Sequence, residues 1–345
     1  MPPVWDADPI LFTLPGIDWP VRWYGLFFAC AFLAGYALFR WQAERGGRGA
    51  DLAASFIVPG FIGTLLGARL GHILFYNLDY FLADPLWLFR IWEGGLASHG
   101  ATAGLLLALL WQSRRSRIPF WEMCDRFSFS AAAGAALIRA GNLFNSEIVG
   151  RIAPPDSPFG VAFPRYDGLP APWCPARYPT QILEFLLGTA VLGSLLAADR
   201  LLGRERRPRG ALAALFLILY FAGRFCVEFL KERQNAADSL LLSRGQILSI
   251  LPFLAGVSLL AWAFRRRLPA GAAPARPSPG PPGSCRPGGE GRGMGKPGGK
   301  AGRGGKGKPG RGGAKRGGGK GPGAPGAGGG GAPPAAGPPG GRREG

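Results

Sequence analysis

The chain has 345 residues, of which 47% are hydrophobic, and a formal net charge of +19. Much of that charge lies at the C-terminus, because the chain from Pro269 onward contains fourteen Lys and Arg against two Glu, or +12 of the total. With only two histidines and five cysteines at unpaired spacing, the sequence lacks the ligand sets of zinc and haem sites. We therefore expect no metal, no cofactor and no disulfide.

Residues 1–268 contain repeated apolar runs of about twenty residues, the length of helix that crosses a hydrocarbon layer roughly 30 Å thick. Seven runs occur, near residues 20–39, 54–76, 95–112, 125–145, 181–199, 211–230 and 246–264. An acidic leader with Asp6, Asp8 and Asp18 precedes the first run, so we expect no cleavable signal peptide. The fold class that this pattern predicts is an all-α polytopic membrane protein with about seven transmembrane helices.

Basic residues between the runs predict the orientation. The segments after the first, third, fifth and seventh runs hold fourteen basic residues, all arginines, whereas the opposite loops hold eight basic residues spread over longer stretches and mixed with acidic ones. Since cytoplasmic loops carry the excess of Lys and Arg, the N-terminus is predicted to be periplasmic and the C-terminus cytoplasmic, in a bacterial inner membrane.

Two domains are expected. Residues 1–268 form the transmembrane domain, and its loop at about 146–179, rich in proline, is predicted to be an irregular extracytoplasmic segment. Residues 269–345 are almost all Gly, Pro, Ala, Lys and Arg, a composition that predicts a disordered cytoplasmic tail. Its spaced charges suit weak contact with anionic lipid headgroups. Nucleic acid is the less favoured partner.

Three arginines, Arg69, Arg139 and Arg224, lie within or near the outer ends of predicted helices. A charged side chain at membrane depth costs about 2.5 to 3.5 kcal/mol on insertion scales, so it usually faces a wet cavity or a partner. The structural alternative is a salt bridge, such as one between Arg224 and Glu228 one turn later. Arg126 lies at the inner end of the fourth predicted helix, where an interfacial charge costs little.

The most informative run extends from Arg139 to Arg151, where polar residues interrupt the outer end of an apolar helix. Asn142 and Asn145 follow Arg139 at intervals of three residues, which places all three on one helix face. A guanidinium group beside two carboxamides suits a phosphate and its glycerol hydroxyls. A helix cap combined with a salt bridge is the structural alternative.

The spacing resembles the signature of the prolipoprotein diacylglyceryl transferase family, Arg-x-Gly-Asn-x-x-Asn-x-Glu-x-x-Gly, and all six positions match, from Arg139 to Gly150. Further matching stretches are 22–25, 67–71, 92–100, 177–184, 224–229 and 245–249. Two positions depart from the family pattern, Ile138 and Ala101, where glycine is usual. The basic tail has no counterpart in that pattern.

The resemblance implies a transferase that moves an sn-1,2-diacylglyceryl group from phosphatidylglycerol to the lipobox cysteine of a prolipoprotein, forming a thioether and releasing glycerol phosphate. His99 is the implied base, since free imidazole has a pKa near 6.5, and Arg139 and Arg224 are the implied catalytic cations. The implied substrate-binding residues are Tyr24, Arg69, Arg139, Asn142, Asn145, Glu147, Gly150 and Glu228. We interpret His72 as a packing residue.

Most of these residues fall towards the outer ends of their predicted helices, so one outward cavity is expected to hold them. The alternative function is that of a membrane transporter for an anionic solute, because intramembrane arginines also line transport pathways. Such a protein should show pseudo-repeated halves and interrupted helices, and the sequence shows neither.

Overall fold

A computed structural model of the chain describes residues 2–91, 94–154, 156–232 and 242–271. All of these residues fall within one compact unit. In this part of the chain, helices of 18 residues or more occupy the seven predicted positions. They are α1 (Trp23–Arg45), α2 (Asp51–Tyr76), α4 (Ser98–Arg115), α5 (Phe120–Phe144), α7 (Thr180–Leu201), α8 (Ala211–Glu228) and α9 (Arg244–Arg266).

Among the described residues, α1, α2, α7, α8 and α9 are long and apolar enough to cross a membrane. The protein is therefore a multi-pass α-helical membrane protein. Helices α4 and α5 do not meet the same composition requirement. The first two turns of α5 explain this in part, because they carry Glu122, Asp125 and Arg126. The count of seven membrane crossings thus stays a prediction.

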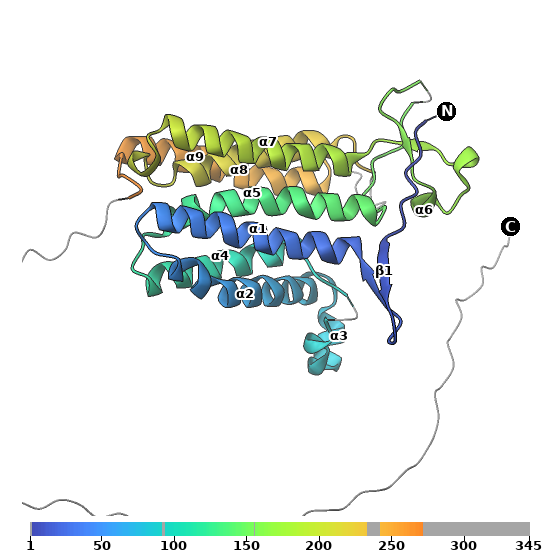
Figure 1. Cartoon of the computed structure of the whole chain (residues 1–345), viewed down its shortest axis with the longest axis horizontal. Helices are drawn as coiled ribbons and strands as arrows, with labels where there is room; N and C mark the ends of the chain where they lie inside the picture. Colours follow the sequence, from blue (N-terminus) through green and yellow to red (C-terminus); the bar gives the residue numbers. More distant parts are fainter. Residues whose placement is uncertain (1, 92–93, 155, 233–241, 272–345) are drawn as a thin grey trace, which may run out of the picture. The chain divides into compact units, whose positions relative to one another are not determined.

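The long helices run alternately in opposite directions and pack side by side (Figure 1). Helix α1 packs mainly on α5, α2 on α4, α5 on α7, and α8 on both α7 and α9. As a result, the starts of α1, α4, α7 and α9 lie at the same end of the bundle as the ends of α2, α5 and α8 (Figure 1). We call this the site end, and its opposite the arginine end.

Short elements gather at the site end. Strands β1 (Ile10–Leu14) and β2 (Trp19–Arg22) form an antiparallel hairpin before α1. After α2 come α3 (Leu78–Ala83) and the 3-10 helix η1 (Pro85–Phe89). The proline-rich loop contains β3 (Val161–Ala162), α6 (Pro164–Asp167), η3 (Ala171–Trp173) and β4 (Ala176–Arg177), with β3 and β4 paired antiparallel. This agrees with the predicted irregular loop region.

Glycines bring α2 and α4 into close contact. A Cβ atom added at Gly63 would lie 2.8 Å from the carbonyl oxygen of Gly104, and one added at Gly71 would lie 2.7 Å from the Cα of Gly100. Neither distance is possible for a real side chain, so glycine is required here. Small residues let helix backbones approach closely where no hydrophobic effect drives association in lipid. This packing places the start of α4, with His99, against the last turns of α2.

Arg126 is fully buried at the arginine end. Its guanidinium group donates hydrogen bonds to Glu122 at 2.9 Å, to Glu205 at 2.8 Å and to the carbonyl oxygen of Gln42 at 2.6 Å. Arg126 thus lies near the start of its helix, as the sequence indicated, but its side chain is enclosed by the protein. Its charge is balanced by carboxylates because helices α1 and α5 and the turn at Glu205 converge on it.

The 3-10 helix η4 (Arg204–Arg206) follows α7 at the arginine end. The segment 269–271 folds against this turn. The N–H of Ala270 donates to the carbonyl oxygen of Arg207, and that of Gly271 donates to the carbonyl oxygen of Glu205, both at 3.0 Å. Ala270 is completely buried. The first three residues of the predicted tail thus belong to the folded body, and the rest of that tail lies outside the described residues.

Candidate functional site

The centre of the site end is the carboxylate of Glu184 on α7, which is 2% exposed. Its Oε2 lies 3.0 Å from Nε of Arg139 on α5, and its Oε1 lies 2.9 Å from Nζ of Lys231 and 3.4 Å from Nη1 of Arg224 on α8. A single buried carboxylate thus holds three cations from two neighbouring helices and the turn after α8. A charge this deeply buried is retained only with such partners.

Glu184 was not among the residues predicted for the site. It lies in one of the matching stretches, 177–184, and is an acidic residue within an otherwise apolar run, which was the available signal. Lys231 was also missed, because its position after a predicted helix end made it appear to be a loop residue. Which carboxylate meets which cation depends on helix packing, and one-dimensional spacing does not contain that information.

The motif that begins at Arg139 folds back on itself. Asn142 donates from Nδ2 to Oε1 of Glu147 at 2.8 Å, and Asn145 donates to the same oxygen at 3.4 Å. Arg139 in turn donates from Nη1 to Oδ1 of Asn142 at 3.2 Å. Ser146 has a φ of 50°, a left-handed conformation that is costly for a residue with a side chain. This turn brings the side chain of Glu147 back to Asn142 and Asn145 at the end of α5.

Helix α7 fixes that turn from the other side. Gln181 donates from Nε2 to the carbonyl oxygen of Glu147 at 2.8 Å, and Thr180 donates from its hydroxyl to the carbonyl oxygen of Ile148 at 2.9 Å. Both side chains are fully buried. The first turn of α7 therefore positions the motif. It also fixes the end of α5, which carries Arg139, relative to α7, which carries Glu184.

Gly150 lies where three main-chain segments meet. Its N–H donates to the carbonyl oxygen of Tyr178 at 2.9 Å, and a Cβ atom at this position would lie 2.6 Å from the carbonyl oxygen of Leu230. Any larger residue would push the end of α8 away from the motif. The structure thus gives Gly150 a packing function that keeps Lys231 next to Glu184.

Glu228 and Arg224 do not form the pair that the sequence suggested as a structural alternative. Arg224 meets Glu184, whereas Glu228 lies 3.3 Å from Nζ of Lys231 and accepts a hydrogen bond from the hydroxyl of Ser243 at 3.2 Å. The side chain of Arg224 is 24% exposed, more than that of Arg139 or Lys231. Of the three cations, Arg224 is therefore the one most open to a ligand.

Arg69 is 1% exposed and is bound to the main chain. Its guanidinium group donates to the carbonyl oxygens of Trp87 at 2.6 Å, Leu88 at 3.2 Å and Gly94 at 2.5 Å, and it lies 4.2 Å from the ring centre of Trp87. These contacts hold the segment that leads from η1 to α4. This geometry supports a positioning function for Arg69, one step away from any ligand.

His99 and Tyr24 lie at the starts of α4 and α1, at the same end of the bundle as the charged cluster. The ring of His99 is half-buried and packs edge-on against Phe75, with ring centres 4.9 Å apart, and 6.1 Å from Tyr76, both at the end of α2. The ring of Tyr24, at the start of α1, contacts Gly141 next to Asn142. The structure thus joins Tyr24 to the motif, whereas the ring contacts of His99 are with α2.

The proline-rich loop between α5 and α7 contains ion pairs of its own. Arg177 lies 2.6 Å from Asp167 and 3.0 Å from Glu232. The hydrogen bond from Arg177 to Asp167 raises the pKa of that guanidinium group, and burial raises the pKa of the Cys174 thiol. Cys174 is therefore less nucleophilic than an exposed thiol at neutral pH. Among the described residues, no group of three or more His, Cys, Asp or Glu could hold a metal ion.

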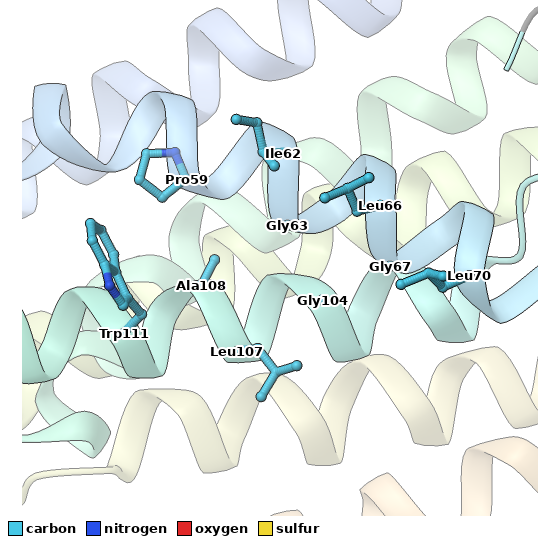
Figure 2. Close-up of a pocket in the computed structure, with 10 residues that line it drawn as sticks. All are labelled: Pro59, Ile62, Gly63, Leu66, Gly67, Leu70, Gly104, Leu107, Ala108 and Trp111. Atoms are coloured by element: carbon cyan, nitrogen blue, oxygen red, sulfur yellow. The ribbon is translucent and has the colours of Figure 1, made fainter. Parts of the chain in front are cut away.

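The apolar surface of α2 and α4 contains a groove of about 370 Å³ (Figure 2). It is lined by Pro59, Ile62, Gly63, Leu66, Gly67, Leu70, Gly104, Leu107, Ala108 and Trp111. None of the predicted site residues lines this groove. Its exposed leucines would face hydrocarbon in a membrane. The single outward cavity expected to hold the whole site thus stays a prediction.

Together, these features define a polytopic membrane protein with a polar, cation-rich cluster at one end of its helix bundle. The family model of prolipoprotein diacylglyceryl transferase matches residues 9–262. Proteins named phosphatidylglycerol–prolipoprotein diacylglyceryl transferase are similar to this chain over 76% of its length. The relative from Vibrio cholerae serotype O1 (strain ATCC 39541) is 36% identical and that from Pseudoalteromonas atlantica is 37% identical, each over 267 residues, and that from Geobacter sulfurreducens is 38% identical over 265 residues.

The matched part covers 94%, 91% and 97% of these three relatives, respectively. The chain belongs to the prolipoprotein diacylglyceryl transferase family. The family match ends before the Gly/Pro-rich tail.

Proposed function

We propose that this protein transfers the sn-1,2-diacylglyceryl group of phosphatidylglycerol to the lipobox cysteine of prolipoproteins. The observation that carries the proposal is the cluster in which Arg139, Asn142 and Glu147 of the matched motif meet Arg224 through Glu184. These are the groups needed to hold a phosphate and its glycerol hydroxyls in a membrane, and they lie at the site end of the bundle. No observation favours transport of an anionic solute.

The two arginines are suited to the leaving phosphate. Within the described part of the chain, Nη2 of Arg139 and both Nε and Nη2 of Arg224 have no hydrogen-bond partner. Guanidinium groups offer planar pairs of donors that match phosphate oxygens. In the reaction, sulfur bonds to the glycerol carbon while the carbon–oxygen bond to phosphate breaks. The electron pair leaves with the phosphate oxygen, where both arginines can stabilise it.

The cysteine must lose its proton before it attacks well, because a free thiol has a pKa near 8.5. We assign the proton acceptor to His99, whose ring is half-buried at the start of α4. Tyr24, Asn142, Asn145 and Glu147 orient the headgroup, with Glu184 and Gly150 holding their supporting framework. Glu228 keeps Lys231 in place. Arg69 acts indirectly, by fixing the segment that precedes His99.

We further propose that the protein lies in a bacterial inner membrane with its N-terminus periplasmic and its C-terminus cytoplasmic. The arginine-rich loops support this orientation through the positive-inside rule. The site end then faces the periplasm, where exported substrates and outer-leaflet lipid meet. The segment from residue 272 onward would form a cytoplasmic extension that contacts anionic headgroups weakly.

The test is to incubate the purified full-length protein with phosphatidylglycerol vesicles and a lipobox peptide, and then to weigh the peptide. We expect the mass of one diacylglyceryl group to be added, together with stoichiometric release of glycerol phosphate. A peptide with serine in place of the lipobox cysteine is the matched control. If folded protein adds no mass to the cysteine peptide, the proposed function is wrong.

A further inference from the structure

A second cluster of arginines surrounds a small pocket at the arginine end, remote from the candidate site. This pocket has a volume of about 160 Å³ and lies between the last turns of α1 and α7. It is lined by Trp41, Arg45, Leu196, Asp199, Arg200 and Arg204. Nothing in the proposed transfer reaction uses it.

The carboxylates next to the pocket already have their charge balanced by arginines. Asp199 is 1% exposed and receives two hydrogen bonds from Arg45, at 2.5 and 2.9 Å, and one from Arg207 at 2.7 Å. Glu205 accepts from Arg45 at 3.0 Å and from Arg126 at 2.8 Å. Burial alone would raise the pKa of Glu205, but Arg126 and Arg207 lower it, so that carboxylate stays ionised and paired at neutral pH.

Two cations of the pocket lining have no counter-charge among the described residues. Arg200 and Arg204 line the pocket with exposed side chains, and within the described part of the chain neither side chain has an ion-pair or hydrogen-bond partner. Arg207, which follows soon after them in the chain, is completely buried, yet its Nε and Nη2 have no hydrogen-bond partner among the residues that the structure describes. The region therefore has more N–H donors than acceptors, and the pocket carries positive charge that an anion would balance.

The walls of the pocket indicate what kind of anion fits. Its apolar lining consists of Trp41, which is 39% exposed in the last turns of α1, and Leu196; outside the pocket, Leu201, next to Arg200 in the chain, is 86% exposed. A partly exposed tryptophan beside arginines at a helix end is typical of the level where lipid headgroups meet hydrocarbon. Basic pockets between membrane helices at this level bind anionic headgroups. A small soluble anion would gain nothing from contact with Trp41 and Leu196, whereas a lipid has acyl chains that can pack on apolar surface.

We propose that this pocket binds the phosphate of an anionic phospholipid in the leaflet opposite the candidate site, with Arg200 and Arg204 on the phosphate oxygens and the acyl chains along the exposed apolar surface of α7. The lipid would act as a structural ligand that bridges the ends of α1 and α7. It is not a substrate, because the pocket and the Glu184 cluster lie at opposite ends of the bundle.

Native mass spectrometry of the full-length protein in detergent tests the proposal, with phosphatidic acid titrated against phosphatidylcholine. The pocket variant is Arg200→Gln with Arg204→Gln. The matched control is Arg265→Gln with Arg266→Gln, which removes the same charge from exposed positions at the same end of the bundle. None of these substitutions changes the candidate site, so any anionic lipid bound there is bound equally by every variant. A difference in lipid binding between variants therefore reports on the pocket.

Wild type is expected to retain one more phosphatidic acid than the pocket variant, whose affinity for that lipid should fall about 30-fold from the loss of two surface charges. The control variant should bind as wild type does, and Arg200→Lys with Arg204→Lys should keep most of the affinity. If both glutamine variants lose the same affinity for phosphatidic acid, the lipid responds only to the overall surface charge, and the proposal is overturned. Displacement of the lipid by excess sn-glycerol 3-phosphate would also overturn it, in favour of a soluble anion.

Discussion

Replacing Glu184 with glutamine tests the organisation of the site most directly. The substitution keeps the shape of the side chain but removes the charge that Arg139, Arg224 and Lys231 share. Breaking a buried ion pair by removing one partner costs about 3 to 5 kcal/mol when the other charge stays buried. The three cations here retain side-chain exposures of 14%, 24% and 11%, so water can solvate them in part. We therefore expect a loss of stability of about 2 kcal/mol, below that range.

The effect on catalysis should be larger than the effect on folding. Without the carboxylate, the guanidinium groups repel one another and the phosphate-binding geometry shifts. A misplacement of about 1 Å in a positioning group costs roughly 100-fold in rate. We expect Glu184→Gln to lower kcat/KM for phosphatidylglycerol by about that factor, mainly through kcat if the arginines act on the transition state. Glu184→Asp should restore part of the rate, because the charge returns at a shorter reach.

The assay combines transfer to a lipobox peptide with thermal unfolding in detergent. Glu44→Gln is the matched control, since Glu44 forms an exposed pair with Arg40 at 2.8 Å, and ion pairs that water surrounds contribute little to stability. Both measurements should be nearly unchanged in that variant. If Glu184→Gln protein folds and turns over lipid at the wild-type rate, the carboxylate does not organise the cations and the account of the site is refuted.

Four further outcomes are expected. Arg139→Ala should abolish transfer while the protein still inserts, and Arg139→Lys should rescue weakly because an ammonium group cannot form a bidentate contact; lipid transfer and membrane yield measure this. His99→Gln should slow transfer, with a deficit that shrinks as pH rises towards the thiol pKa near 8.5; a pH-independent deficit would make His99 a positioning residue. Gly104→Val should separate α2 from α4 and destabilise the bundle by about 3 kcal/mol or more, seen in thermal unfolding, whereas valine at exposed Leu107 should not. Removing residues 272–345 should leave transfer in detergent unchanged, and a folded but inactive truncation would contradict the proposed topology.

The positions of the helices, the polar motif and the shared end of most predicted site residues could be read from the sequence. Helix positions follow from the thickness of hydrocarbon, which requires long apolar runs wherever the chain crosses a membrane. The short spacing within the motif places Arg139 and Asn142 on one face because helix geometry is local. Such signals need no knowledge of which helices become neighbours.

Only the tertiary structure decided the pairing of charges. Glu184 became the centre of the site because α5, α7 and α8 pack so that three cations reach one carboxylate. Arg69, which stays a predicted substrate-binding residue, donates to main-chain carbonyls that lie 18 to 25 residues later in the chain. Arg126 is buried, and two of its partners, Gln42 and Glu205, come from distant parts of the chain. An arginine in an apolar run signals only that a partner exists, because Coulomb attraction and hydrogen bonding act over a few ångströms and depend on which helix faces meet.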